Sequence, residues 1–179
     1  DRVASRGLGD VYKRQVLMGS GTGVAVGIYA TEFASMLAQS PLGRSVYAST
    51  NSLSVACGRV SFVLGMQGPC AAFETACSAS LVACHSAARA LQHLECASHL
   101  VVGINLMLLQ GSSIGMAIAG MTSLNGRSHT FDSRADGFAR GEGASALAMV
   151  QGAGRVRVQG SAVRQDGRSA SLTAPNGQA

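Results

Sequence analysis

The stretch FETACSASLVACHSAARALQHL, residues Phe73–Leu94, decides how the rest of the chain folds. Its opening residues are typical of a β-strand, and the residues after Cys77 have the spacing of one helix. We expect Ser78 and Ser80 to cap that helix. The line from Cys77 continues at helical spacing through Leu81, Cys84, Ala88 and Leu91. The stretch therefore predicts a thiol where a strand turns into a helix, and the first-turn N–H groups and the helix dipole there favour a thiolate.

Four other cysteines compete with Cys77 for the role of nucleophile. Cys84 is expected to pack on the core, and Cys57 lies mid-helix among apolar neighbours, which favours a buried structural thiol. Cys70 begins the strand and Cys96 follows the helix. Only Cys77 combines a helix start with small neighbours, but from position alone a nucleophile and a small buried residue remain equally good interpretations.

The cysteine pattern also bears on metals and on the compartment. The sequence has no C-x-x-C motif and no histidine at ligand spacing, so we expect no zinc site. An odd number of cysteines without a secretory signal favours reduced thiols inside the cell. We expect a cytoplasmic location, with a plastid as the alternative.

None of the four histidines is a convincing base for Cys77. His85 lies eight residues along the same helix, roughly 12 Å away at 1.5 Å per residue, and cannot reach the thiol. His93 is farther still, and His99 begins a strand with its ring satisfied by local bonds. His129 lies in a glycine-rich loop, the only region that could fold back towards Cys77.

Composition limits the classes of function. Of the 179 residues, 47% are hydrophobic and 13% charged, which indicates a well-buried domain or part of one. The net charge of +5 comes from dispersed arginines with one lysine, so we expect no nucleic-acid partner. The longest apolar run, Leu100–Leu109, is far shorter than the 20 or so residues that a membrane span needs.

The pattern of elements predicts an α/β fold with a mixed sheet. The short link Gln151–Gly154 predicts an antiparallel hairpin between the last two strands. In segment Asp1–Gln15 the apolar residues follow neither the helical nor the strand period, and we interpret it as a disordered or artefactual terminus before a folded unit at 16–179. Strands are expected at Val24–Tyr29, Cys70–Thr75, His99–Leu108, Ala144–Val150 and Arg155–Val163, and further helices at Thr31–Gln39, Asn51–Leu64 and Ile114–Gly120.

Two glycine-rich segments invite other interpretations. The glycines of Gly19–Gly23 resemble a dinucleotide loop, but that fingerprint needs a helix after the glycines, and here a strand-like run follows. In the loop Asn125–Gly143 the charges alternate in sign. We favour a set of salt bridges that holds the loop, and the other interpretation is a lining for the site entrance. The charged residues are Asp132, Arg134, Asp136, Arg140 and Glu142.

Longer stretches carry a family resemblance. ETACSASLVACHSAARAL, preceded by LSVACGRVSFVLGMQGPC, resembles the nucleophile region of β-ketoacyl synthases, and more narrowly the ketosynthase domains of type I polyketide synthases. Further stretches agree in the same order: GINLML, then AGMTSLNGRSHTFDSRADGFARGEG, then GSAVRQDGRSASLTAPNG. Together they extend over roughly Gly27–Gly177, and such an ordered series is far more specific than a single motif.

The resemblance implies the thiolase-like fold, with stacked α-β-α-β-α layers, of which this chain is the N-terminal part with the nucleophile. It implies a homodimer and a decarboxylative Claisen condensation. An acyl group passes from an acyl carrier protein to Cys77, whose backbone N–H is one oxyanion donor. A malonyl-type extender on the carrier then loses carbon dioxide and attacks the thioester. No cofactor is bound directly, because phosphopantetheine of the carrier holds the substrates.

The chain also departs from the family pattern. The two catalytic histidines of the family lie beyond the stretch that matches Leu172–Gly177, so none of the four histidines inherits their role. We therefore expect acylation of Cys77 without condensation. The alternative is a non-catalytic, ketosynthase-like scaffold for dimer or carrier-protein contacts.

Overall fold

The structure is a computed structural model that describes residues 15–29, 32–41, 52–152 and 156–171, with Ala174 and Asn176. These residues form a four-stranded sheet in the order β2-β1-β3-β4. Strands β1, β2 and β3 are parallel, and β4 is antiparallel to β3. The expected terminus Asp1–Gln15 lies, except for Gln15, outside the described residues. The strands are β1 (Gly23–Ile28), β2 (Cys70–Phe73), β3 (Ser98–Asn105) and β4 (Gly143–Val150).

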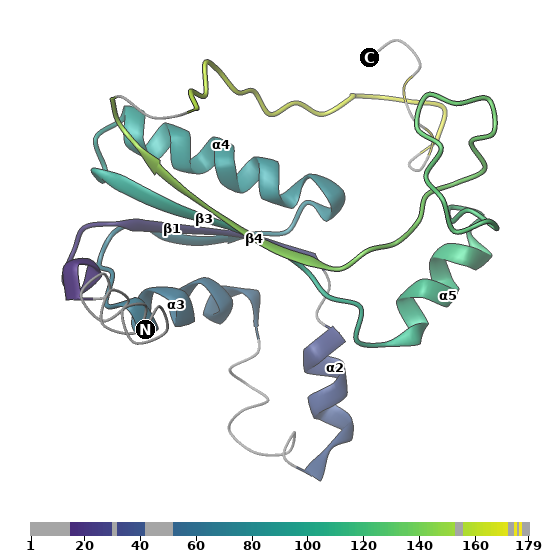
Figure 1. The fold of residues 1–179 in the computed structure, drawn as a ribbon, viewed down its shortest axis with the longest axis horizontal. Helices are drawn as coiled ribbons and strands as arrows, with labels where there is room; N and C mark the ends of the chain where they lie inside the picture. The colour runs from purple at the N-terminus through teal and green to yellow at the C-terminus, as the bar shows by residue number, and fades with distance from the viewer. Residues whose placement is uncertain are drawn as a thin grey trace, which may run out of the picture.

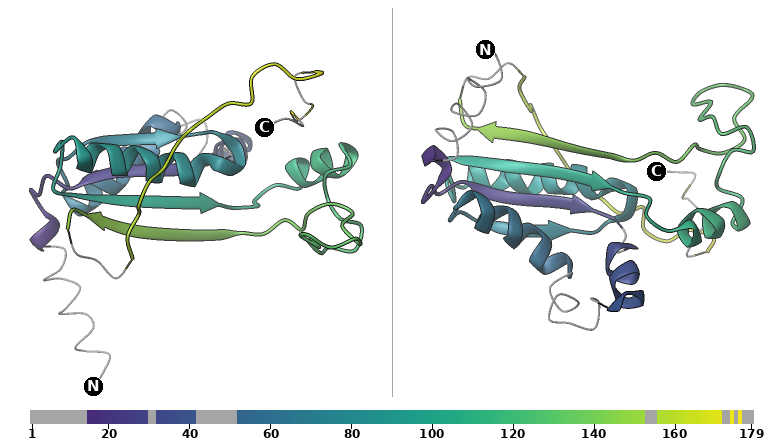
Figure 2. Two further views of the ribbon diagram at one scale, coloured as in Figure 1. Left: turned by 90° about the horizontal axis from the view of Figure 1, so that it is seen from above. Right: turned by 60° about the horizontal axis from the view of Figure 1, so that its bottom comes forward.

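Helices cover both faces of the sheet, as an α/β fold requires (Figure 1). Helix α3 (Leu53–Leu64) lies on one face and α4 (Ala79–Gln92) on the other (Figure 2). Val24 and Val26 of β1 pack on the α3 side, whereas Ala25 packs on the α4 side. This alternation follows from the two-residue period of a strand. Two shorter helices, α2 (Glu32–Gln39) and α5 (Gln110–Ile118), lie beyond the ends of β1 and β3.

Helix α3 confirms the expected element and its end. Gly65 has φ +69°, a left-handed conformation that glycine adopts without strain, and it closes the helix at Leu64. Ser52 occupies the N-cap position, and Asn51 lies outside the described residues. Cys57 is buried at 4% exposure, as expected for a thiol in the middle of this helix.

The fully buried residues of helix α4 share only Leu91 with the line that the sequence indicated. Its buried residues are Ala79, Ala83, Ala87, Ala90 and Leu91, whereas Leu81 is 74% exposed. The physical reason is the size of the side chains, because a stripe of alanines lets the helix backbone approach the sheet closely. Cys84 does pack at the edge of this contact, as predicted.

The last predicted strand is wrong, and so is the hairpin. None of the described residues 156–163 belongs to a strand; they run across the outer side of α4 (Figure 1), where a 2.9 Å hydrogen bond joins His85 Nδ1 to Ser161 Oγ. Strand β4 instead pairs with β3 along its whole length, from Ser98 opposite Val150 to Asn105 opposite Gly143. The other edge of β4 carries no partner strand among the described residues.

The other predicted elements are present with shifted ends. Strand β2 ends at Phe73 and β3 at Asn105, earlier than expected, and α5 begins four residues before Ile114. Within the described residues, no helix is long and apolar enough to cross a bilayer.

Candidate active site

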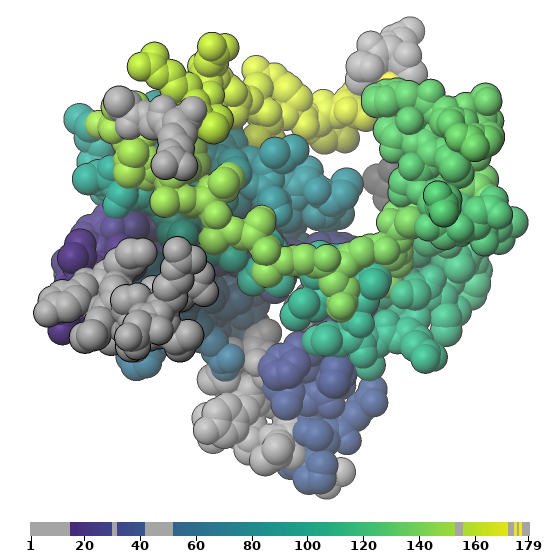
Figure 3. All heavy atoms as spheres, viewed as in Figure 1, coloured from purple at the N-terminus to yellow at the C-terminus, as the bar shows by residue number. Residues whose placement is uncertain are grey.

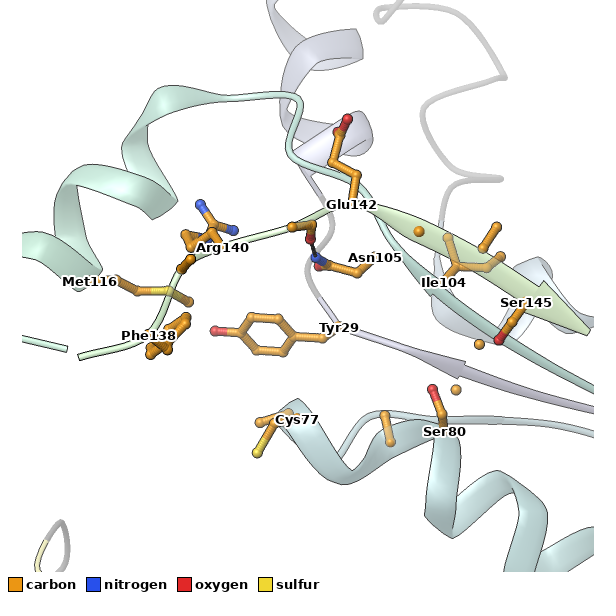
Figure 4. A pocket seen from close by; sticks show the side chains of 18 of the residues that line it. Tyr29, Cys77, Ser80, Ile104, Asn105, Met116, Phe138, Arg140, Glu142 and Ser145 are labelled. Atoms are coloured by element: carbon orange, nitrogen blue, oxygen red, sulfur yellow. Dashed lines mark hydrogen bonds between the residues drawn. The ribbon is translucent and has the colours of Figure 1, made fainter. Parts of the chain in front are cut away.

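A pocket of approximately 680 Å³ opens at the carboxyl ends of β1 and β3, and Cys77 lies on it (Figure 4). In an α/β sheet this end is where ligands usually bind. The pocket separates the start of α4 from the loop after α5, and Figure 3 shows the surface hollowed between these two parts. Other residues on its wall are Tyr29, Ser80, Asn105, Met116, Phe138, Arg140 and Glu142.

Two glycines on neighbouring strands allow α4 to begin so close to the sheet. Gly27 and Gly103 are partners in the β1–β3 register. A Cβ at Gly27 would lie 2.5 Å from Ser80 Cα and 2.6 Å from the Ala79 carbonyl carbon. A Cβ at Gly103 would lie 2.5 Å from Ser80 Oγ. The start of α4, and with it Cys77, therefore rests directly on the bare backbone of two strands.

Cys77 is exposed and lies in a short 3₁₀ turn, η2 (Ala76–Ser78), just before α4. Ala76 has φ +52°, a left-handed conformation that costs an alanine roughly 1–2 kcal/mol. Such strain persists only where surrounding contacts hold it, and it is frequent at functional sites. The turn presents the Cys77 side chain at the rim of the pocket.

The predicted capping by serine is wrong in its detail. Ser78 occupies the N-cap position of α4, but its hydroxyl donates to the Thr75 carbonyl oxygen and to Thr75 Oγ1, each at 2.8 Å. Ser80 lies inside the helix with its hydroxyl towards Gly103. The hydroxyl of Ser78 thus closes the turn, and the first N–H groups of α4 are left without a side-chain cap.

The opposite wall depends on Glu32, a residue that the sequence reasoning missed. Its Oε2 accepts hydrogen bonds from the backbone N–H groups of Leu108 (2.6 Å) and Leu109 (2.8 Å), and its Oε1 accepts one from the Ser112 hydroxyl. The Ser112 hydroxyl, followed by the Leu109 N–H, lowers the pKa of Glu32 below its ordinary value of 4.5. A carboxylate at the start of α5 also complements the helix dipole.

Glu142 continues this arrangement by one residue. Its Oε1 accepts the Met107 N–H at 2.6 Å, so two glutamates hold three consecutive N–H groups of the β3–α5 link. Asn105 Nδ2 donates to the Gly141 carbonyl oxygen at 2.5 Å, and the Arg140 guanidinium donates to Ser113 Oγ. These contacts attach the loop before β4 to the link after β3, and they shape the wall that faces Cys77.

Some of the alternating charges in the loop Asn125–Gly143 hold the loop, and others line the pocket, so each of the two interpretations of the sequence applies to part of the loop. Asp132 and Arg134 form a salt bridge at 2.7 Å, which holds the pKa of Asp132 below its usual range. Asp136 accepts a hydrogen bond from Asn125 Nδ2. These three residues hold the outer part of the loop, whereas Arg140 and Glu142 line the pocket. The favoured salt-bridge set therefore reduces, among the described residues, to one ion pair.

All four histidines lie in the described part of the chain, and none of them lines this pocket. His85 bonds to Ser161, and His93 Nε2 lies 3.1 Å from an Arg89 guanidinium nitrogen. His99 is buried, its Nδ1 lies 3.3 Å from the Leu100 carbonyl oxygen, and burial lowers its pKa. The expectation that His85 is no partner for Cys77 agrees with this placement. The described residues contain no group of His, Cys, Asp or Glu that could hold a metal ion.

The sequence is similar to bacterial polyketide synthases. Residues 9–152 match the family described as the β-ketoacyl synthase N-terminal domain. The chain is 43% identical over 169 residues to one of the phenolphthiocerol/phthiocerol polyketide synthase proteins of Mycobacterium tuberculosis, covering 89% of this chain and 11% of that protein. It is 40% identical over 170 residues to polyketide synthase GfsB of Streptomyces halstedii, covering 90% of this chain and 3% of that one. The chain thus spans about a tenth or less of these relatives.

The structure is similar to solved ketosynthases. The ketosynthase from module 6 of the bacillaene synthase from Bacillus subtilis 168 superposes with a TM-score of 0.78 at 33% identity, over 92% of this chain and 29% of that one. The ketosynthase domain OzmH KS7 of oxazolomycin synthesis from Streptomyces albus superposes with a TM-score of 0.65 at 28% identity, over 75% of this chain and 24% of that one. The predicted thiolase-like α/β fold is confirmed by these likenesses.

Proposed function

Because the chain belongs to the β-ketoacyl synthase family, we propose that it is the nucleophile-bearing part of a polyketide-type ketosynthase and that Cys77 carries the acyl group. The observation that supports this most is the position of Cys77, exposed in the turn just before α4 and on the wall of the pocket of approximately 680 Å³. The thiolate is the nucleophilic form of a thiol, and the exposed position of Cys77 lets an acyl donor reach its sulfur.

In the first step the Cys77 thiolate attacks the carbonyl carbon of an acyl thioester on the phosphopantetheine arm of an acyl carrier protein. The new carbon–sulfur bond forms and the carbonyl oxygen becomes an oxyanion. When the oxyanion collapses, the bond to the carrier sulfur breaks, and the carrier leaves as a thiolate that takes a proton from water. The Cys77 backbone N–H lies in the 3₁₀ turn just before α4, and we assign it as a donor that stabilises that oxyanion. The pocket has room for the acyl chain beside Tyr29, Met116 and Phe138.

In the second step a malonyl-type extender loses carbon dioxide, and its carbanion attacks the Cys77 thioester and releases the thiolate. This step needs donors that polarise the extender carbonyl, a role that histidines fill in the family. Because no histidine of this chain lines the pocket, we propose that the chain alone accepts an acyl group but does not condense it. The condensation histidines would come from another segment of the enzyme.

The same proposal covers partners and location. An acyl carrier protein delivers both acyl groups, and the ketosynthase works as a homodimer inside the cell. Neither a nucleic acid nor a membrane belongs to this function. The substrates arrive on phosphopantetheine, so the site itself holds no cofactor.

The test is acylation of the 179-residue chain by an acyl phosphopantetheine thioester, followed by peptide mass mapping. We expect one acyl adduct on Cys77, its loss in Cys77→Ala, and its retention in the matched variant Cys84→Ala. Addition of a malonyl thioester should give no condensation product. An adduct on Cys84, or condensation by this chain alone, contradicts the proposal. Slow and equal alkylation of all five thiols would favour the scaffold alternative.

A further inference from the structure

Cys70 lies on the face of the sheet that α3 covers. In the parallel β1–β2 register it is the partner of Val24, and partners on neighbouring strands point to the same side. Val24 belongs to the buried cluster that contains Cys57 of α3. The sheet register therefore directs the Cys70 side chain towards α3, on the same side as the Cys57 thiol.

The side-chain contacts bring the two thiols together. Cys57 and Ser61 are four residues apart and so share one face of α3. Ser61 Oγ donates a hydrogen bond to Cys70 Sγ at 3.4 Å. The Cys57 thiol itself donates to the Ser54 carbonyl oxygen at 3.4 Å, and burial, followed by the neighbouring Cys70 thiol, raises its pKa. One face of α3 thus places a buried thiol against a thiol of the neighbouring strand.

The other three cysteines are separated from this pair. Cys84 belongs to α4 and packs on the opposite face of the sheet, and Cys96 belongs to a cluster with Leu91 at the far end of that helix. Cys77 lies beyond the end of β2, in the turn at the pocket. Among the five cysteines, Cys57 and Cys70 are therefore the two that the fold places side by side.

We propose that Cys57 and Cys70 form an oxidisable dithiol, which hydroperoxides convert to a disulfide between α3 and β2. Cys70 is exposed, whereas Cys57 is only 4% exposed, so the peroxide reaches Cys70 first. The Cys70 sulfur attacks one peroxide oxygen, which gives a sulfenic acid and one water or alcohol. The Cys57 sulfur then attacks the Cys70 sulfur, the S–S bond forms, and the hydroxyl leaves as water.

These two steps balance in atoms and electrons: the two thiols are oxidised and lose two hydrogens, and the peroxide bond is reduced. Burial, followed by contact with Cys70, raises the pKa of the Cys57 thiol above its usual value of 9.0. The second step should therefore become faster as the pH rises, since the thiolate is the attacking form. The proposal is independent of the proposed acylation, because neither thiol lines the pocket with Cys77.

The experiment treats the reduced 179-residue chain with hydrogen peroxide, blocks the remaining thiols and digests without reduction. Cleavage after arginine and glutamate separates the relevant cysteines: residues 45–59 contain Cys57, residues 60–74 contain Cys70, and residues 75–89 contain Cys77 and Cys84. We expect the cross-linked product of 45–59 with 60–74 to predominate. By the loop it closes, the disulfide should also raise the Tm by roughly 5–10 °C.

Two variants and one unfolded control decide the outcome. Cys57→Ala should abolish the cross-link and leave a sulfenic acid on Cys70 that dimedone traps, whereas the matched change of another buried thiol, Cys96→Ala, should leave the cross-link intact. The same treatment in concentrated urea should distribute cross-links among many pairs. A main cross-link from Cys70 to residues 75–89, equal products with and without urea, or Cys57 and Cys70 still reduced after Cys77 is oxidised would each overturn the proposal.

Discussion

Gly27, which lies directly beneath the start of α4, gives the sharpest prediction, namely the effect of Gly27→Ala. The added Cβ would lie 2.5 Å from the backbone N and Cα of Ser80. Ordinary carbon contacts begin near 3.5 Å, so the first turn of α4 must move by about 1 Å. Overpacking of this kind costs roughly 1–3 kcal/mol of folding free energy. A misplacement of about 1 Å at a reacting group can lower its rate on the order of 100-fold.

These two magnitudes can be measured separately. A domain with about 5–15 kcal/mol of stability stays mostly folded after such a loss, so the Cys77 acylation rate reports on geometry. Urea unfolding gives the stability, and mass spectrometry gives the initial rate of adduct formation on Cys77. The matched control is Gly58→Ala in α3, where a Cβ meets nothing within 4 Å. That change should raise the stability by up to about 1 kcal/mol and leave the rate unchanged.

A second glycine sharpens the test, because its obstacle is a side chain. The Cβ of Gly103→Ala meets Ser80 Oγ at 2.5 Å, whereas that of Gly27→Ala meets backbone atoms. Adding Ser80→Ala should therefore restore most of the loss in Gly103→Ala and none of the loss in Gly27→Ala. Rescue of Gly27→Ala by Ser80→Ala, or a Gly27→Ala chain with the stability and rate of the parent, would refute the reasoning.

Three further predictions follow from single contacts. The stability that Glu32 gives should be fully present above its unfolded pKa, near 4.5, and be lost as the pH falls through its lower folded pKa. In Glu32→Gln the stability should therefore depend less on pH in this range, as measured by acid unfolding followed by circular dichroism. A difference in stability between the two chains that is the same at all pH values counts against this. Ala76→Gly should relieve the left-handed conformation and raise the urea-unfolding free energy by about 1 kcal/mol, and a loss of stability would show that the residue is not strained. Ala83→Leu, at a fully buried position, should cost roughly 1–3 kcal/mol of unfolding free energy, whereas Leu81→Lys on the exposed face should change the Tm little. The opposite order would mean that Leu81, as the sequence indicated, lies on the buried side of α4.

Local pattern predicted most of the elements, because those elements carry their signals within themselves. The αL glycine at Gly65 ended α3 where the sequence placed it, and the strand before Cys77 is present with a shorter end. The wrong stripe on α4 has a tertiary cause. Leu81 has higher hydrophobicity than Ala83, but the bare backbone at Gly27 and Gly103 selects the small side chains, and that selection is visible only once the strands are paired.

The residues of the candidate site also fall into those with a local signal in the sequence and those without one. The position of Cys77 between a strand and a helix could be predicted because such a junction is a local feature. The contacts of Glu32 could not be predicted, since it binds N–H groups 76 and 77 residues away in sequence. The segment 156–163 has a β-like local pattern, but its described residues belong to no strand, and Ser161 instead bonds to His85 of α4. The thiol pair shows both effects together. Cys57 and Cys70 look like two ordinary cysteines in sequence, and only the register that sets Cys70 beside Val24 makes them neighbours. In this chain the position of a thiol along its helix or strand is therefore specified locally, but the residues that surround it are specified by strand pairing.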